Sequence, residues 1–324
     1  MELAILGTES LGVRGLCCLV RAGGRCILVD PGVALGYTRN GLHPHPCQVA
    51  VGDAVRDRII SAFSEATDIV FSHYHGDHIP LADANPYQLP LGRVPPVKAG
   101  LWFRGTSELS PRSLKRREDL IAYMDGDAAN PEGREGPVLT FSNPVPHGPP
   151  GSHPGSVMMT RVTGDDYSFV HASDIQLLNR EAADVIAGWE PDIAIASGPP
   201  LYLNKISAEE RESAREYAIE LAGSAGVLIL DHHLLRSEEG FSWLEEVSAE
   251  AGGNIISAAD FTGRRTDVLE AKRKEMYEKR PVPEGWHEAY AKGKTGFFDY
   301  VDSGLSKELA EIRSRETVDI RNLI

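Results

Sequence analysis

Three histidines and one aspartate stand within six positions in the segment FSHYHGDHIP, residues 71–80. The apolar run that precedes them has the length and composition of the end of a buried strand. His73 and His75 are two positions apart, so in an extended chain their imidazoles point to one side. The glycine that follows lets the backbone turn and bring Asp77 and His78 to the same place. Imidazole and carboxylate are ligands of zinc, iron or manganese, so this spacing predicts a site for one or two metal ions at a strand end.

Apolar runs of strand length alternate with helical patterns along the rest of the chain. The strand-like runs cover residues 3–6, 16–20, 26–30, 68–72, 156–162, 167–171, 192–196 and 227–231. Helices are expected over 53–64, from Ser110-Pro111, over 176–187 and over 207–223. The order is two strands, then αβ units, then two strands and αβ units again. This order predicts an α/β sandwich with two similar halves.

The segment after residue 262 is charged, helical in pattern and unlike any earlier part of the chain. We therefore expect one domain over residues 1–261 and, over 262–324, a helical extension packed on the same domain. The four cysteines include no C-x-x-C pair, and we expect them to be reduced and buried. No apolar run approaches the ~18 residues of a membrane span, and the start MELAILG lacks the basic region of a secretory signal. A cytoplasmic protein with no membrane partner is expected.

The formal net charge of −14 at pH 7 disfavours long nucleic acids as partners, because affinity for them rests on neutralising phosphates with Lys and Arg. A small anionic substrate stays compatible with this charge, since bound divalent cations reverse the local field at an acidic site. The basic run at residues 112–117 is expected to be a solvated helix face, with an anion-binding patch as the alternative. The sequence leaves a homo-oligomer open.

The motif HYHGDH at residues 73–78 resembles the metal motif of the metallo-β-lactamase superfamily. The other motifs of that superfamily occur in the expected order along the chain. They are Asp30 in VDPG before this motif, and His147 in VPHG, Asp174 in SDIQ and a histidine in LDHHLLR after it. These wordings resemble an uncharacterised, mainly archaeal branch of the superfamily. The resemblance implies an αββα four-layer metallo-β-lactamase-type sandwich, of the α/β class, with a dinuclear site along one edge.

What the resemblance implies for the ligands is specific. One metal would be held by His73, His75 and His147 and the other by Asp77, His78 and His232, with Asp174 bridging the two. Asp77 would also be the catalytic residue that orients the attacking water or accepts its proton. Asp30 would orient the histidines rather than bind a metal. Two alternatives stay open, because His153 competes with His147 and His233 competes with His232.

The loop YTRNGLHPHPCQ after Asp30 holds Arg39, His43, His45 and Cys47. It is read as a surface loop, as a loop that faces substrate through Arg39 and His45, or as a further metal site.

We choose His232 as the metal ligand because neighbours on a strand point to opposite faces, which leaves His233 to face the substrate or to pack.

The expected function is a dinuclear metal-dependent hydrolase that uses a metal-bound hydroxide on a phosphodiester or another small anionic ester. The cofactors would be two divalent transition-metal ions, with zinc as the first choice and iron or manganese as alternatives. The alternatives to this function are a lactone or thioester hydrolase and a non-catalytic metal-binding subunit on the same fold.

Overall fold

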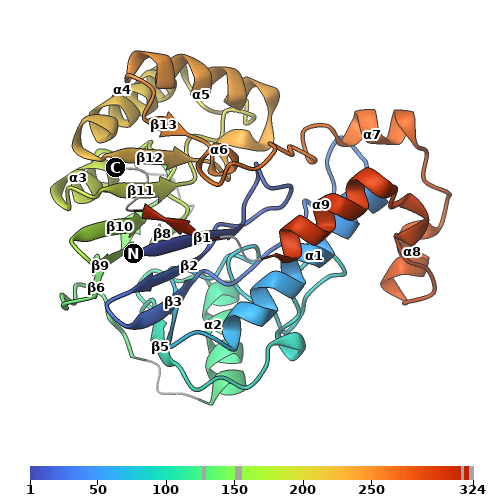
Figure 1. Cartoon of the computed structure of the whole chain (residues 1–324), viewed down its shortest axis with the longest axis horizontal. Helices are drawn as coiled ribbons and strands as arrows, with labels where there is room; N and C mark the ends of the chain where they lie inside the picture. Colours follow the sequence, from blue (N-terminus) through green and yellow to red (C-terminus); the bar gives the residue numbers. More distant parts are fainter. Residues whose placement is uncertain (126–128, 150–154, 315–316, 321–324) are drawn as a thin grey trace.

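Two six-stranded mixed sheets lie face to face in the computed structural model, which describes residues 1–125, 129–149, 155–314 and 317–320 (Figure 1). The first sheet has the order β14-β1-β2-β3-β4-β5. Its strands are β1 (Glu2–Gly7), β2 (Cys17–Ala22), β3 (Arg25–Val29), β4 (Asp68–Phe71), β5 (Gly100–Phe103) and β14 (Val318–Asp319). Strands β3, β4 and β5 run parallel, and the other pairings are antiparallel.

The second sheet has the order β13-β12-β11-β10-β9-β6. Its strands are β6 (Leu139–Phe141), β9 (Thr160–Gly164), β10 (Tyr167–His171), β11 (Ile193–Ala196), β12 (Val227–Leu230) and β13 (Ile255–Ile256). Strands β10 to β13 run parallel, whereas β9 is antiparallel to both of its neighbours. A separate two-stranded ribbon joins β7 (Val145–Pro146) to β8 (Ser156–Val157).

Helices cover the outer face of each sheet (Figure 1). Those on the first sheet are α1 (Pro46–Phe63), α2 (Pro111–Met124) and α9 (Ser303–Arg313), and those on the second are α3 (Arg180–Gly188), α4 (Ala208–Ser224) and α5 (Glu238–Glu250). The shorter helices are α6 (Ala258–Phe261), α7 (Arg273–Lys279), α8 (Trp286–Ala291), η1 (Leu91–Arg93), η2 (Leu234–Arg236) and η3 (Phe298–Tyr300). The four layers confirm the expected αββα sandwich.

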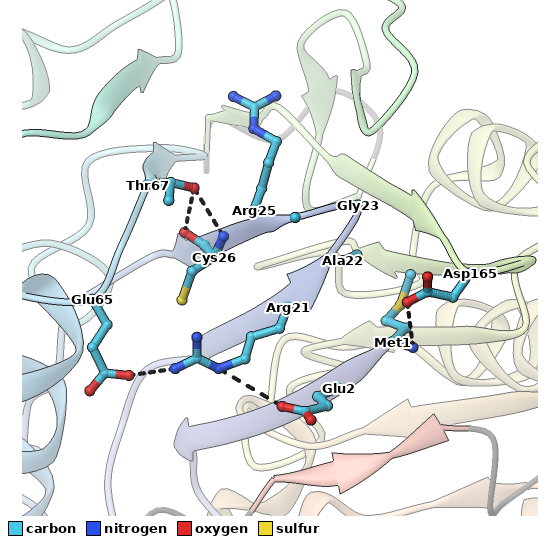
Figure 2. A pocket seen from close by; sticks show the side chains of 11 residues that line it. Met1, Glu2, Arg21, Ala22, Gly23, Arg25, Cys26, Glu65, Thr67 and Asp165 are labelled. Carbon is cyan, nitrogen blue, oxygen red and sulfur yellow. Dashed lines mark hydrogen bonds and ion pairs between the residues drawn. The ribbon is translucent and has the colours of Figure 1, made fainter.

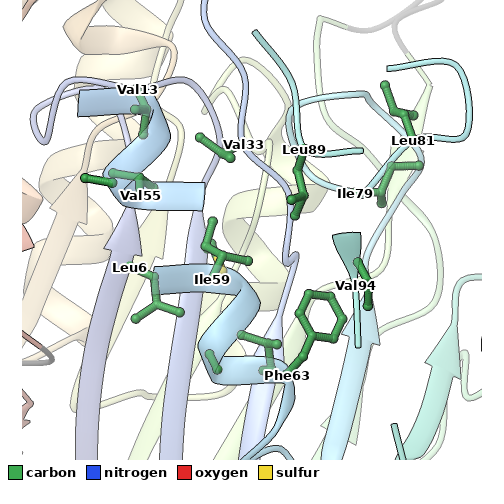
Figure 3. Close-up of a cluster of buried hydrophobic side chains, with 14 of the residues drawn as sticks. Leu6, Val13, Val33, Val55, Ile59, Phe63, Ile79, Leu81, Leu89 and Val94 are labelled. Atoms are coloured by element: carbon green, nitrogen blue, oxygen red, sulfur yellow. The ribbon is translucent and has the colours of Figure 1, made fainter. Parts of the chain in front are cut away.

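Alternating side chains along each strand separate three hydrophobic clusters. Leu3 and Ile5 of β1 point between the two sheets, where they pack with residues of the second sheet such as Phe169. Leu6 points the other way, onto Ile59 of α1 (Figure 3). All of these side chains are fully buried, and each contributes about 1.5–3 kcal/mol to folding. Because strands are buried on both faces, they appear in the sequence as continuous apolar runs.

Several element boundaries differ from the sequence-based expectation. Helix α1 begins at Pro46 rather than at residue 53, because His45 is its N-cap and accepts a hydrogen bond from the Cys47 N–H. Helix α3 begins at Arg180 rather than at residue 176. The run at 156–162 is divided between β8 and β9, since its first two residues pair with β7. The sequence did not predict the short strands β5, β6, β13 and β14.

The segment after residue 262 contains α7, α8 and α9, as its helical pattern predicted, but it also contains β14. Strand β14 pairs antiparallel with β1, with Asp319 opposite Glu2. Helix α9 packs against α1, and its Leu309 and Ile312 are buried in the same cluster as α1. The segment therefore adds an edge strand to the first sheet and a helix to the layer that covers it. The domain boundary at residue 261 stays a prediction.

Within the described ranges, the helices include none that is long and apolar enough to cross a membrane. No disulfide joins the four cysteines, all of which lie in the described part of the chain.

Candidate metal centre

The site is assembled at one edge of the two sheets, where parallel strands end. Asp30 directly follows β3, and residues 73–78 follow β4, its parallel neighbour. Asp174 follows β10, and residues 232–233 follow β12 in the parallel part of the second sheet. Because the carboxyl ends of parallel strands share one edge, this topology gathers side chains that are far apart in the sequence.

Asp174 lies at the centre of the cluster and is 1% exposed. Its Oδ2 lies 3.2 Å from His73 Nε2 and 3.0 Å from His75 Nδ1. Its Oδ1 lies 3.1 Å from His78 Nε2 and 3.4 Å from His232 Nε2. The two oxygens of one carboxylate thus face two different pairs of histidines.

The remaining predicted ligands lie on either side of this carboxylate. The His147 ring, just after β7, has its centroid 5.4 Å from that of His75 and 6.1 Å from that of His73. Asp77 lies on the other side, with its Oδ2 3.4 Å from His232 Nε2. His153, the alternative to His147, lies outside the described residues.

Asp30 is fully buried and forms hydrogen bonds with residues of the cluster and with their neighbours. Its Oδ2 accepts hydrogen bonds from Ser72 Oγ at 2.7 Å, Ser173 Oγ at 2.6 Å and His78 Nδ1 at 3.1 Å, and its Oδ1 accepts one from the Ser72 N–H at 2.9 Å. Ser72 Oγ also lies 2.8 Å from His73 Nδ1, so Asp30 orients one imidazole directly and another through a hydroxyl. Asp30 and Ser173 both have left-handed backbones, with φ of 47° and 54°. Such conformations are costly for these residue types and recur at functional sites.

The sequence did not identify Ser72 and Ser173 as parts of the site. Each stands immediately before a predicted ligand, His73 or Asp174, and that position was the available signal. A short hydroxyl side chain there reaches back to the buried carboxylate while the next side chain points forward into the cluster.

His232 and His233 both reach the cluster, so the argument from strand alternation does not apply. Strand β12 ends at Leu230, and the two histidines lie in the turn that leads to η2. Their ring centroids are 4.7 Å apart, and His233 Nε2 lies 3.6 Å from Asp174 Oδ1. His232 is the one near Asp77, and its Nδ1 accepts a hydrogen bond from the Gly15 N–H at 3.1 Å.

Two glycines allow the backbone to come close to the cluster. A Cβ at Gly32 would lie 2.1 Å from the Ile79 nitrogen and 2.2 Å from the His78 carbonyl carbon. A Cβ at Gly15 would lie 2.4 Å from the Asp77 carbonyl oxygen, and its φ is +121°. Both contacts are with backbone atoms, so a side chain at either position would displace the metal motif itself.

A buried network of charged residues lies next to Asp77 and His232. Arg236 Nη2 lies 2.8 Å from His232 Nε2 and 3.4 Å from Asp77 Oδ2, and Arg236 Nε lies 3.3 Å from Glu9 Oε2. Glu270, from the C-terminal segment, accepts a hydrogen bond from Arg14 Nε at 2.7 Å. The sequence offered no signal for the Arg14–Glu270 and Arg236–Glu9 contacts, because the partners in each lie more than 200 residues apart.

The two glutamates of this network differ in protonation. Burial and, after it, the charge of Glu270 raise the pKa of Glu9 to about 8, so Glu9 keeps its proton at neutral pH. Burial also raises the pKa of Glu270, but the hydrogen bond and charge of Arg14 outweigh it and lower that pKa to about 2. Glu270 therefore carries the negative charge that faces the arginines.

The two residues predicted from the loop after Asp30 lie in different places. Arg39 joins the charge network, since its Nη2 donates to the Arg236 carbonyl oxygen at 2.7 Å and its Nη1 lies 3.5 Å from Glu270. His45 packs on the C-terminal segment, with its Nε2 2.9 Å from the Arg280 carbonyl oxygen. The described contacts of His45 include none with the His/Asp cluster, so the structure does not bring it to the site.

The donor set of the cluster fits divalent transition metals. Four groups of side chains each place their donor atoms within 4.8 Å of one another, and they are Asp30-His73-His78, His73-His75-Asp174, Asp77-His78-His232 and Asp174-His232-His233. Bonds of about 2.0–2.2 Å to one ion require donors no more than about 4.4 Å apart, which is close to this spacing. In addition, the buried His73 Nε2 faces the Asp174 carboxylate, with Oδ2 3.2 Å away.

The protonation states also suit metal binding, which needs neutral imidazole and ionised carboxylate. Burial lowers the pKa of His73 to about 3, and burial followed by the charge of Arg236 lowers the pKa of His232 to about 4. Burial raises the pKa of Asp174, but the charges of His78 and His233 and hydrogen bonds from His73 and His75 hold it well below its usual range. His78 differs: burial lowers its pKa, but the charge and hydrogen bond of Asp174 raise it well above the ordinary value.

The cluster opens into a cavity of about 330 Å³. Its lining includes His73, His75 and His147 of the cluster and residues at the start of α2, among them Arg112 and Arg116. The basic run of the sequence therefore reaches the candidate site.

A second cavity, of about 560 Å³, lies at the opposite edge, next to the amino ends of β3 and β4 (Figure 2). Its arginines are paired there: Arg21 lies 3.9 Å from Glu2 and also contacts Glu65, and Arg25 Nε donates to Asp68 Oδ2 at 2.7 Å. It contains none of the predicted site residues.

Comparisons with known proteins give close relatives by sequence and more distant ones by structure. The chain is 47% identical over 302 residues to a UPF0282 protein of Methanosarcina mazei, covering 93% of this chain and all of that one. It is 35% identical over 290 residues to a UPF0282 protein of Methanopyrus kandleri, covering 85% of this chain and 99% of that one. These relatives confirm the expected archaeal branch. No family model matches the chain.

Among solved structures, an isothiocyanate hydrolase from Delia radicum gut bacteria matches with a TM-score of 0.50 and 15% identity, covering 80% of this chain and 96% of that one. The metallo-β-lactamase fold protein YhfI from Bacillus subtilis matches with a TM-score of 0.47 and 16% identity, covering 82% and 98%. At 15% identity the likeness to the isothiocyanate hydrolase concerns the fold alone, and it agrees with the four-layer sandwich described above.

Proposed function

The chain belongs to the UPF0282 protein family, and from the geometry of its His/Asp cluster we propose that it is a dinuclear metal-dependent hydrolase. The observation that carries the proposal is the orientation of the Asp174 carboxylate. One oxygen faces His73 and His75, and the other faces His78 and His232. A carboxylate placed in this way has the arrangement of a bridge between two ions.

In this proposal, His73, His75 and His147 would hold one metal, Asp77, His78 and His232 would hold the other, and Asp174 would contribute to both. Zinc is the first choice, with iron or manganese as alternatives, since all three accept nitrogen and carboxylate ligands. Two such ions supply Lewis-acid stabilisation of a substrate oxygen and lower the pKa of a coordinated water.

The protein's own residues would position the reaction. Asp77 is ionised, because burial raises its pKa but the hydrogen bond to His232 and the charges of His78, His232 and Arg236 hold it well below its usual range. Its side chain is 20% exposed, so it is accessible to a water molecule at the cluster. We assign to Asp77 the orientation of the attacking water. Arg236, which contacts both Asp77 and His232, would fix that orientation.

The proposed substrate is a phosphodiester or another small anionic ester. A cavity of about 330 Å³ is at the small end of the range for small-molecule pockets. The net charge of −14 adds to this preference for a small substrate over a long nucleic acid.

The test combines metal analysis with a substrate panel. The purified protein, after reconstitution with zinc, iron or manganese, should hold up to two ions per chain and cleave an activated phosphodiester. A His75→Ala, Asp174→Ala double variant should lose metal, and full metal content in that variant would falsify the site. Cleavage of lactones or thioesters without any diester would keep the site and change the reaction class. A metal-loaded protein that hydrolyses nothing would favour a non-catalytic metal-binding subunit.

A further inference from the structure

The cavity above the His/Asp cluster has a basic wall that the proposed ligand set does not use. Arg112 and Arg116 lie on the first two turns of α2 and line the same cavity as His73, His75 and His147. A molecule that fills this cavity touches the histidines and the guanidinium groups at the same time. The basic wall is therefore in a position to select what binds.

Arg116 is anchored at the site. Its Nη1 donates a hydrogen bond at 2.9 Å to the carbonyl oxygen of Tyr74, which lies between the two cavity-lining histidines of the metal motif. Its buried Nε makes no hydrogen bond within the described structure. Burial and then repulsion by the charge of Arg112 lower the pKa of Arg116, and the charges of Asp83 and Asp77 offset part of this effect. A bound anion would relieve this repulsion.

Arg112 is exposed, and among the described residues it has no hydrogen bond or ion pair. The other charged residue of the wall is Glu108, so two guanidinium groups stand against one carboxylate. The helix terminus itself contributes little, because the Ser113 N–H is already bonded to the Ser110 side chain at 3.2 Å. The side chains, rather than the helix end, provide the positive charge.

We propose that Arg112 and Arg116 form an anion subsite, and that the substrate is a compact ester carrying a phosphate group that this subsite binds while the ester faces the histidines. Guanidinium groups suit this role because their planar N–H donors match phosphate oxygens in bidentate geometry. The proposal rests on the proposed hydrolase function for the ester, but the phosphate contact is independent of catalysis.

The first test measures binding of inorganic phosphate to the full-length, metal-loaded protein by isothermal titration calorimetry. Arg112→Ala and Arg116→Ala should each weaken binding about tenfold, the usual effect of removing a charge-assisted hydrogen bond. Lys115→Ala is the matched control. Lys115 lies on the same helix, is paired with Asp119 at 2.8 Å and does not line the cavity, so this variant should bind as the wild type does.

Arg112→Ala is the decisive variant, because Arg112 has no described contact whose loss would disturb the fold. Elemental analysis of each variant should show unchanged metal content, which separates loss of the subsite from loss of the metal site. Phosphate binding that is absent in the wild type, unchanged in Arg112→Ala, or weakened equally in Lys115→Ala would overturn the subsite.

A second test compares two esters that differ only in a phosphate group away from the scissile bond. The wild type should have at least a tenfold lower KM for the phosphate-bearing ester, and Arg112→Ala should lose that preference. If neither ester is hydrolysed but phosphate binding still depends on Arg112, the hydrolase function fails and the subsite stands. If both esters are hydrolysed with equal KM in the wild type and in Arg112→Ala, the subsite fails and the function stands.

Discussion

Replacement of Asp30 by asparagine should weaken metal binding although Asp30 is not among the proposed ligands. Asparagine keeps the shape but removes the charge and puts an N–H₂ group where one oxygen was. Oδ2 accepts three of the four hydrogen bonds and Oδ1 accepts one, from the Ser72 N–H. The least costly orientation therefore turns the amide N–H₂ toward the Ser72 N–H, which leaves these two buried donors facing each other without an acceptor.

The magnitude follows from these contacts. An unsatisfied buried donor costs about 1–3 kcal/mol, and the remaining bonds lose the charge assistance that roughly doubles their strength. We expect Asp30→Asn to lower the free energy of unfolding by about 2–4 kcal/mol. Because Asp30 orients His78 directly and His73 through Ser72, metal affinity should fall by about 10–100-fold.

The control is Asp68→Asn. Asp68 is 1% exposed and accepts hydrogen bonds from Arg25, Thr67 and Trp102, but it lies at the start of β4, away from the site. Denaturant unfolding should show a loss of stability in both variants, whereas competition with a chromophoric chelator should show weaker metal binding only in Asp30→Asn. Wild-type metal affinity in Asp30→Asn, or an equal loss in Asp68→Asn, would refute the reasoning.

Three further predictions concern the same edge. Gly32→Ala should reduce metal affinity at least tenfold, since its Cβ would lie 2.1 Å from a backbone nitrogen, whereas Gly92→Ala, with no heavy atom within 4 Å, should bind metal normally in the same titration. His232→Ala should lose the second metal and turnover, while His233→Ala should keep its metal by elemental analysis; the opposite pattern would make His233 the ligand. Because the pKa of His78 is raised, its imidazole holds a proton at pH 7 that a metal must displace, so apparent affinity should increase with pH. Calorimetry in buffers of different ionisation enthalpy should show the released proton, and its absence would contradict this assignment.

The strand-end positions of the site were predictable from sequence because they depend on local pattern. The ligands predicted after β4, β10 and β12 follow apolar runs, and parallel strands place such positions at one edge, whereas His147 follows β7 of the antiparallel ribbon. What lies beside each ligand was less predictable. Asp30 bonds Ser72 and Ser173, and the second of these contacts joins residues 143 positions apart.

The choice between His232 and His233 shows where pattern reasoning stops. Alternation holds only inside a strand, and the last strand residue is Leu230. Beyond it, the turn is set by tertiary contacts, in which Asp231 accepts hydrogen bonds from the side chain of Thr8, from both the N–H and the hydroxyl of Ser10, and from the Ala258 N–H. The structure places His45 away from the cluster for a related reason, because its place as a helix cap directs its ring toward the C-terminal segment.

Glu270 connects the segment after residue 262 to the candidate metal centre by its charge. Its carboxylate is the ionised partner of Arg14 and lies near Arg39, and both arginines stand behind the Asp77 side of the cluster. Without this carboxylate, one negative charge fewer would offset Arg14, Arg39 and Arg236, although Glu9 also lies beside Arg236. The repulsion between these cations and a divalent ion at the cluster would then be stronger. Metal binding is therefore expected to depend on the packing of the segment after residue 262, which supplies Glu270.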